Sequence, residues 1–165
     1  MANPTVPFGL RACLVAGMGQ FEKAREFDKD AAATVIYEGD VVSQEADSNI
    51  APGGTPGTTN YKGVSLNWGA AGVITKHLVI TDPAATFLAR ASTGTLAVAD
   101  RGQYANFVFG AGNTFAPRIS GHSLAGASKA TTTTLDAFLI QFWKDTKNEE
   151  GANAVFEIKI NRRQP

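Results

Sequence analysis

Two runs near the C-terminal end constrain the fold most strongly. From Val155 to Asn161 the sequence VFEIKIN alternates apolar and polar residues, which is typical of a strand with one buried face. The preceding run from Leu135 to Trp143, LDAFLIQFW, is largely apolar on both faces, which indicates a central strand. Four β-branched threonines, Thr131–Thr134, lead into this run, and a polar turn, KNEEGAN, separates the two. The pattern therefore predicts a hairpin with a long turn.

The rest of the chain has the same character, with short β-forming runs separated by turn residues. Strands are expected over 34–42, 72–80, 86–91, 95–99 and 103–109, and residues 21–30, FEKAREFDKD, fit either a short helix or an exposed edge strand. A long Gly/Pro/Thr loop fills 43–60. No long amphipathic helical pattern occurs. We predict an all-β fold, a small barrel or sandwich of seven to nine short strands with little helix, formed as a single domain by residues 21–165.

Residues 1–20 are predicted to form an extended N-terminal arm, because two prolines and three glycines disfavour helix there. The arm also carries spaced apolar residues, which suits docking onto another surface. An ordinary first strand packed on the core of its own chain fits the same residues equally well. If the arm docks, the residues expected to bind the other surface are Pro4, Val6, Pro7, Phe8, Gly9 and Leu10.

Charge and cysteine content narrow the functional classes. Fifteen basic residues balance fifteen acidic ones, whereas a nucleic-acid-binding protein normally has a basic excess. Only 18% of the residues are charged, and a surface so poor in charge is often partly covered by a partner. The single cysteine, Cys13, excludes an internal disulfide and a cysteine-based zinc site. The sequence shows no signal-peptide pattern and no run long enough to span a bilayer, so we expect synthesis in the cytoplasm and no membrane partner.

The residues that catalysis would need are scarce. His77 lies in a predicted strand without a second metal ligand nearby, and a histidine on a strand face is the simpler interpretation. Ser120, Ser123 and His122 with a remote Asp100 can be drawn as a hydrolase triad, but the G-x-S-x-G pattern is missing. Phosphate-binding and dinucleotide-binding loops and a complete calcium loop are also missing. We predict that the chain is not an enzyme and needs no cofactor or metal.

Four short segments, in this order, resemble a family of tailed-phage structural proteins. The chain opens with MANPTVPFGLR over Met1–Arg11, and IYEGDVV follows over Ile36–Val42. ITDPAATF over Ile80–Phe87 is the third match. The fourth is the C-terminal order of a Thr-rich strand start, an Asn-x-x-Gly-Ala turn and a close on Ile160–Asn161. Together they are spread over most of the length of the chain, and the middle third matches least.

The resemblance implies a capsid decoration, or cement, protein with a β-tulip-like or small β-barrel fold. Such a protein binds the outer surface of the mature phage head at junctions between capsomers and stabilises it against the pressure of packaged DNA. Its partners would be the major capsid protein and further copies of itself, as a homotrimer or a dimer. Two alternatives remain open: a tail-associated structural protein, and a β module that binds carbohydrate on a host surface through Tyr61 and Trp68.

Overall fold

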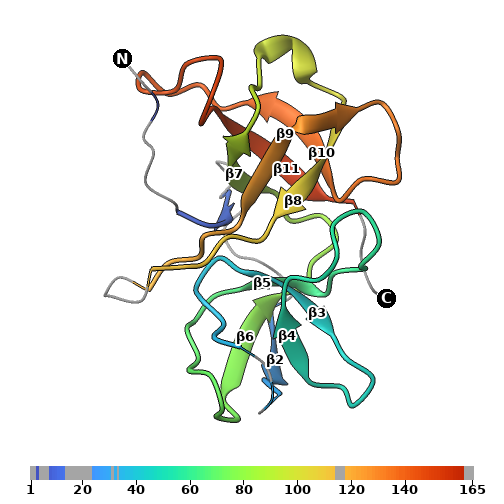
Figure 1. The fold of residues 1–165 in the computed structure, drawn as a ribbon, viewed down its shortest axis with the longest axis vertical. Helices are drawn as coiled ribbons and strands as arrows, with labels where there is room; N and C mark the ends of the chain where they lie inside the picture. The colour runs from blue at the N-terminus through green and yellow to red at the C-terminus, as the bar shows by residue number, and fades with distance from the viewer. Residues whose placement is uncertain are drawn as a thin grey trace.

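The computed structural model describes residues 3, 8–13, 24–30, 32, 34–113 and 118–161. These residues form eleven strands and one 3-10 turn, Val98–Asp100, so the predicted all-β class with little helix is confirmed. The strands build two sheets that lie one above the other (Figure 1). The strand count exceeds the predicted seven to nine because several strands are only two or three residues long.

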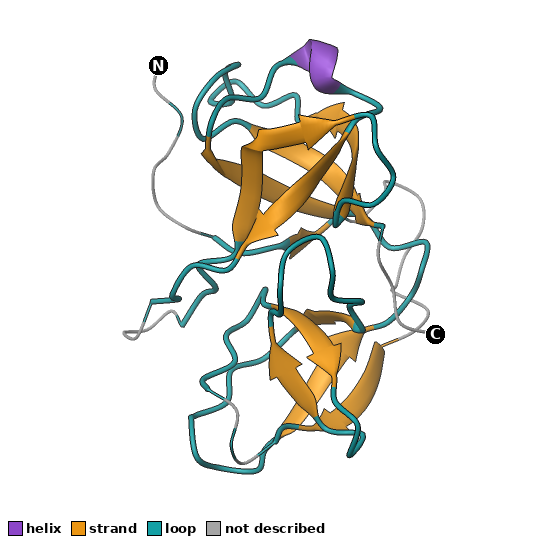
Figure 2. Ribbon diagram, turned by 45° about the vertical axis from the view of Figure 1, so that its right-hand side comes forward, coloured by secondary structure: helices purple, strands orange, loops and turns teal. Residues whose placement is uncertain are grey.

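The first sheet closes into a barrel, which is the upper unit in Figures 1 and 2. Its strand order is β1-β7-β11-β10-β8-β9, and a parallel pairing of β7 with β9 joins the two sides. All other pairings in this sheet are antiparallel. The strands are β1 (Arg11–Ala12), β7 (Phe87–Thr93), β8 (Tyr104–Val108), β9 (Ser123–Ala130), β10 (Ala137–Phe142) and β11 (Val155–Ile160).

The second sheet has five antiparallel strands in the order β2-β6-β5-β3-β4. A parallel bridge between Lys29 and Ile50 brings its two outer strands together, so this sheet also curls on itself. The amide of Asp30 donates to the Ile50 carbonyl at 3.2 Å at the same place. The strands are β2 (Ala24–Asp28), β3 (Val41–Gln44), β4 (Ile50–Pro52), β5 (Gly63–Ser65) and β6 (Lys76–Ile80).

One hydrophobic core joins the two sheets. Val41, Val64 and Ile80 of the second sheet belong to the same buried cluster as the inward residues of the barrel, such as Phe87 and Phe156. A smaller cluster of Ile36, Val42, Ile50 and Val79 fills the second sheet itself. Because apolar burial is the main stabilising term in folding, this shared core fixes the seam between the sheets.

The C-terminal hairpin forms as predicted. β10 lies between β11 and β8, and Phe156, Ile158 and Ile160 are buried while Lys159 and Asn161 are exposed. Glu157, on the polar face, is buried as well and accepts a hydrogen bond from Gln141 at 2.6 Å. The expected strand start at Thr131–Thr134 is wrong, because these residues are exposed and lie in the loop before β10. The Asn161 side chain donates to the carbonyls of Thr133 and Leu135 in that loop, at 2.7 and 2.8 Å.

Of the two alternatives for residues 21–30, the edge strand is confirmed, over residues 24–28. Other expected boundaries need correction. The strand expected over 95–99 is instead a bridge at Leu96 followed by the 3-10 turn. Within the strand expected over 34–42, only Val41 and Val42 belong to β3, because Tyr37–Asp40 make a turn with Gly39 at φ 86°. Strands β4, β5 and β9 were not anticipated.

Candidate functional site

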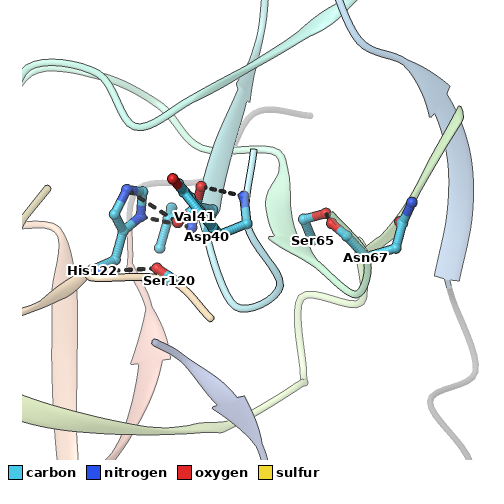
Figure 3. A network of polar contacts seen from close by, with 7 residues as sticks. Asp40, Val41, Ser65, Asn67, Ser120 and His122 are labelled. Atoms are coloured by element: carbon cyan, nitrogen blue, oxygen red, sulfur yellow. Dashed lines mark hydrogen bonds and ion pairs between the residues drawn. The ribbon is translucent and has the colours of Figure 1, made fainter. Parts of the chain in front are cut away.

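The structure brings together part of the serine–histidine constellation suggested by the sequence, with a different acid. Asp40 from the turn before β3 meets Ser120 and His122 from the segment before β9, at the seam between the sheets (Figure 3). Asp100 lies elsewhere and pairs with Lys129 at 2.8 Å. The two segments are joined by the Ser120 amide, which donates to the Glu38 carbonyl at 2.9 Å.

His122 is held in one tautomer by its surroundings. Its Nδ1 accepts the Val41 amide hydrogen at 3.0 Å, so the ring proton is on Nε2, which lies 3.4 Å from Asp40 Oδ1. Ser120 Oγ accepts the backbone amide of His122 at 2.9 Å, so it is not aligned as a nucleophile on a ring nitrogen. This group is therefore a buried structural link between the sheets and does not have the arrangement of a hydrolase triad.

Burial sets the ionisation of this pair. Burial raises the pKa of Asp40 to about 7, although hydrogen bonds from Ser120 and from the Tyr37 amide act in the opposite direction. Burial lowers the pKa of His122 to about 3. At neutral pH His122 is therefore uncharged, and the contact with Asp40 is a polar contact and not an ion pair.

His77 is also fully enclosed. Its Nδ1 lies 3.0 Å from Ser65 Oγ and its Nε2 lies 3.1 Å from Thr75 Oγ1. Burial lowers the pKa of His77, and the neighbouring Lys29 lowers it further. Among the residues that the structure describes, no group of three or more His, Cys, Asp or Glu side chains is placed to hold a metal ion. No helix in the described part of the chain is long and apolar enough to cross a membrane.

The two aromatic residues considered for sugar stacking are placed differently from each other. Tyr61 is fully buried, with its ring edge-on to Phe107 and its hydroxyl donating to Asp136 at 3.2 Å. Trp68 is partly exposed, but the Arg118 guanidinium stacks over its ring at 3.7 Å. The pair therefore does not form a stacking platform, and Tyr61 is a core residue.

The described surface concentrates its large exposed apolar side chains on one hairpin. Of the six such side chains, five lie between the end of β5 and the middle of β6, and we call them the β5–β6 surface: Leu66, Trp68, Val73, Ile74 and Leu78. Lys76 in the same hairpin is neutralised by Asp28 at 2.9 Å and Glu26 at 3.5 Å. Large exposed apolar patches mark interaction sites in soluble proteins, so this hairpin is the candidate interaction surface.

A cavity of about 420 Å³ opens at the seam beside this hairpin. Three segments distant in sequence supply its apolar lining: Phe8, Leu10, Ala12, Leu66 and Ile119. Two lining residues of opposite sign, Arg11 and Glu38, are exposed. Because Leu66 belongs to both features, the seam cavity and the β5–β6 surface adjoin.

The predicted binding arm can be placed only in part. Pro4, Val6 and Pro7 lie outside the described residues. Gly9 has φ 65°, and a Cβ there would lie 2.6 Å from the Cβ of Ser120, so glycine is required at this position. Leu10 is 3% exposed and donates its amide to the Gly39 carbonyl, and Arg11 and Ala12 pair with β7. Leu10 is therefore packed on the core of its own chain, which is the alternative that the sequence left open for this segment, whereas Phe8 lines the seam cavity.

Asn3 provides a second attachment that the sequence did not suggest. Its side-chain nitrogen donates to the carbonyls of Glu149 and Ala152 at 2.7 and 2.8 Å, and its oxygen accepts the Glu149 amide at 2.7 Å. The turn itself is closed by Asn148, which makes three hydrogen bonds to the backbones of Trp143 and Val155. The Asn-x-x-Gly-Ala turn is thus a docking point for the start of the chain.

Replacing Asn3 with alanine is expected to lower the free energy of unfolding by about 1–3 kcal/mol, because it leaves backbone groups of the 149–152 turn without their partner. Asn49→Ala is the matched control, since the Asn49 side chain bonds to its neighbour Asp47 in an exposed turn. Urea denaturation of both variants measures the difference. Equal stability of Asn3→Ala and the control would show that the attachment contributes nothing.

The hairpin surface was not found from the sequence because its residues follow no regular period. The segment LNWGAAGVITKHL over 66–78 mixes glycines with apolar residues, so the pattern predicts neither a buried nor an exposed face.

No protein-family model matches the chain, no curated protein matches its sequence, and no solved structure matches it.

Proposed function

We propose that this chain is a capsid decoration protein of a tailed phage, which binds the outer surface of the mature head at capsomer junctions. Its partners would be the major capsid protein and further copies of itself, as a homotrimer or a dimer. Four ordered sequence matches support the class of protein. The observation that carries a binding role is the β5–β6 surface, where five large apolar side chains are exposed on one hairpin.

The mechanism would be mechanical. Each copy bridges neighbouring capsomers and adds apolar burial across the joint, and many copies on a closed lattice act together. A protein that binds only the expanded lattice stabilises that lattice by mass action. The near-neutral hairpin suits this role, because apolar contacts remain effective at the salt concentrations that screen exposed charges.

The internal placement of the polar groups favours a role without catalysis. The chain has two histidines, and all four of their ring nitrogens contact groups inside the fold. A general base must reach the proton that it abstracts from a substrate, and neither imidazole has a free nitrogen for this.

Binding to purified heads is the direct test. The wild-type chain is expected to co-sediment with expanded heads that lack it, and not with unexpanded precursor shells. Replacing both Trp68 and Leu78 with serine should weaken this binding about 10-fold or more, because truncation of a few central apolar residues removes most of the energy of an interface. Val98→Ser is the matched control, since Val98 is exposed on the opposite unit. Absence of binding to expanded heads would reject the proposed function.

The contribution of the arm needs a change that spares the fold. Removing residues 1–12 would take Leu10 out of the core, and any deletion that includes Asn3 removes its bonds to the 149–152 turn, so loss of binding would have two explanations. Replacing Pro4, Val6 and Pro7 together with serine keeps Asn3 and Phe8–Ala12 in the chain. We propose that Pro4, Val6 and Pro7 contribute to head binding, and unchanged co-sedimentation of this triple variant would exclude them.

A further inference from the structure

The tip of the β5–β6 hairpin is a rigid apolar projection. Val73 is 50% exposed and Ile74 is 64% exposed, the latter being the most exposed of the large apolar side chains in the described chain. The backbone on either side is fixed, because Lys29 Nζ donates to the Val73 carbonyl at 3.3 Å and the Lys29 amide donates to the Thr75 carbonyl at 2.9 Å. A projection held in one conformation loses little entropy when it binds.

The seam cavity is equally preformed. Two backbone hydrogen bonds join residues of its lining, from the Leu10 amide to the Gly39 carbonyl at 3.0 Å and from the Gly39 amide to the Ser65 carbonyl at 2.8 Å. At about 420 Å³ it is large enough to admit apolar side chains of another molecule. Burial of an apolar group against such a lining is favourable, because it removes apolar surface from water.

The projection and the cavity cannot meet within one molecule. The loop between β5 and β6 reaches the end of the second sheet that is remote from the barrel, whereas the cavity lies at the seam with the barrel (Figure 1). Both surfaces are apolar, the charge of Lys76 in the hairpin is neutralised by its own neighbours, and Arg11 and Glu38 of the cavity have opposite signs. Neither surface therefore opposes the other electrostatically.

We propose that the Val73–Ile74 tip of one copy inserts into the seam cavity of a second copy. The two halves of this contact differ, so it is heterologous, and a heterologous contact that closes on itself gives a ring. This inference rests on the proposed function only in taking the β5–β6 surface as an interaction surface. It names the second copy of this chain as the occupant of the cavity.

The test uses one variant for each half of the contact. Ile74→Asp places a charge on the tip, and Ala12→Phe fills the cavity from strand β1. Sedimentation of the wild-type chain should show association that depends on concentration, and each variant alone should weaken that association about 10-fold or more. Val98→Asp, which changes an equally exposed valine on the barrel, should behave as the wild type. Leu66→Glu is a second cavity variant, in case Ala12→Phe disturbs β1.

An equimolar mixture of the two variants gives the decisive result. One intact tip and one intact cavity remain in the mixture, so a heterodimer with one copy of each variant should form and grow no further. If the contact instead joined identical patches, mixing the two variants would restore no association. The proposal is overturned if the wild-type chain stays monomeric, if Ile74→Asp associates normally, or if mixing restores no dimer. Head binding is measured separately, so failure of self-association and failure of the proposed function are distinguishable.

Discussion

Replacing Asp136 with alanine is expected to lower the free energy of unfolding by about 3–5 kcal/mol, a large part of the ~5–15 kcal/mol available to a domain. Asp136 is fully buried at the start of β10. Its Oδ1 accepts the Gly57 amide at 2.9 Å and the Tyr61 hydroxyl at 3.2 Å, and its Oδ2 accepts the Phe107 amide at 2.9 Å. Alanine leaves these three donors without that acceptor inside the fold, and an unpaired buried donor costs about 1–3 kcal/mol.

Asp136→Asn separates hydrogen bonding from shape. The amide keeps one acceptor oxygen but turns an NH2 group towards a donor, so the loss should be smaller than for alanine. Asp145→Ala is the control, because Asp145 accepts a single short-range bond in an exposed turn. Urea denaturation gives all three values. A loss below about 1 kcal/mol for Asp136→Ala would show that these donors find other partners at little cost.

The sequence was informative where the side-chain pattern follows the period of a strand. β8, β10 and β11 were predicted because their apolar residues are large and regularly spaced. β9 was missed because its sequence, SLAGASKA, lacks β-branched residues. The small residues have a packing reason that the sequence does not show, since a Cβ on Gly126 would lie 2.8 Å from the Thr93 carbonyl of the neighbouring strand.

The candidate site was less predictable, because it depends on contacts between distant segments. The acid next to His122 is Asp40, 82 positions earlier in the chain, and the Gly39–Asp40 turn gave no indication of that partner. Asn3 and its turn are separated by almost the whole chain. Local propensity also misled at Thr131–Thr134, where the residues favour a strand but the loop is fixed by Asn161.

The buried pair at the seam predicts an unusual dependence of stability on pH. The pKa of Asp40 is raised by folding, from 3.8 to about 7, so its contribution to stability is complete below pH 4 and is lost as the pH rises to about 7. The pKa of His122 is lowered by folding, from 6.5 to about 3, so its contribution is complete above pH 6.5 and is lost as the pH falls. Between pH 4 and 6.5 each group changes the free energy of unfolding by about 1.4 kcal/mol per pH unit. The two changes have opposite signs, so they cancel.

A variant that lacks one of the two groups should therefore show the pH dependence of unfolding free energy that the other group causes. Asp40→Asn is expected to lose about 3 kcal/mol relative to the wild type as the pH falls from 6.5 to 4, and His122→Gln is expected to gain a similar amount over the same range. Urea denaturation of the three proteins at half-unit steps from pH 4 to 8 measures both slopes. His77 titrates in all three proteins, so its contribution cancels in the differences. The free energy of unfolding should therefore rise with pH in Asp40→Asn and fall with pH in His122→Gln. If both variants instead show the pH dependence of the wild type, folding does not shift the pKa values of the seam pair in the way that their burial implies.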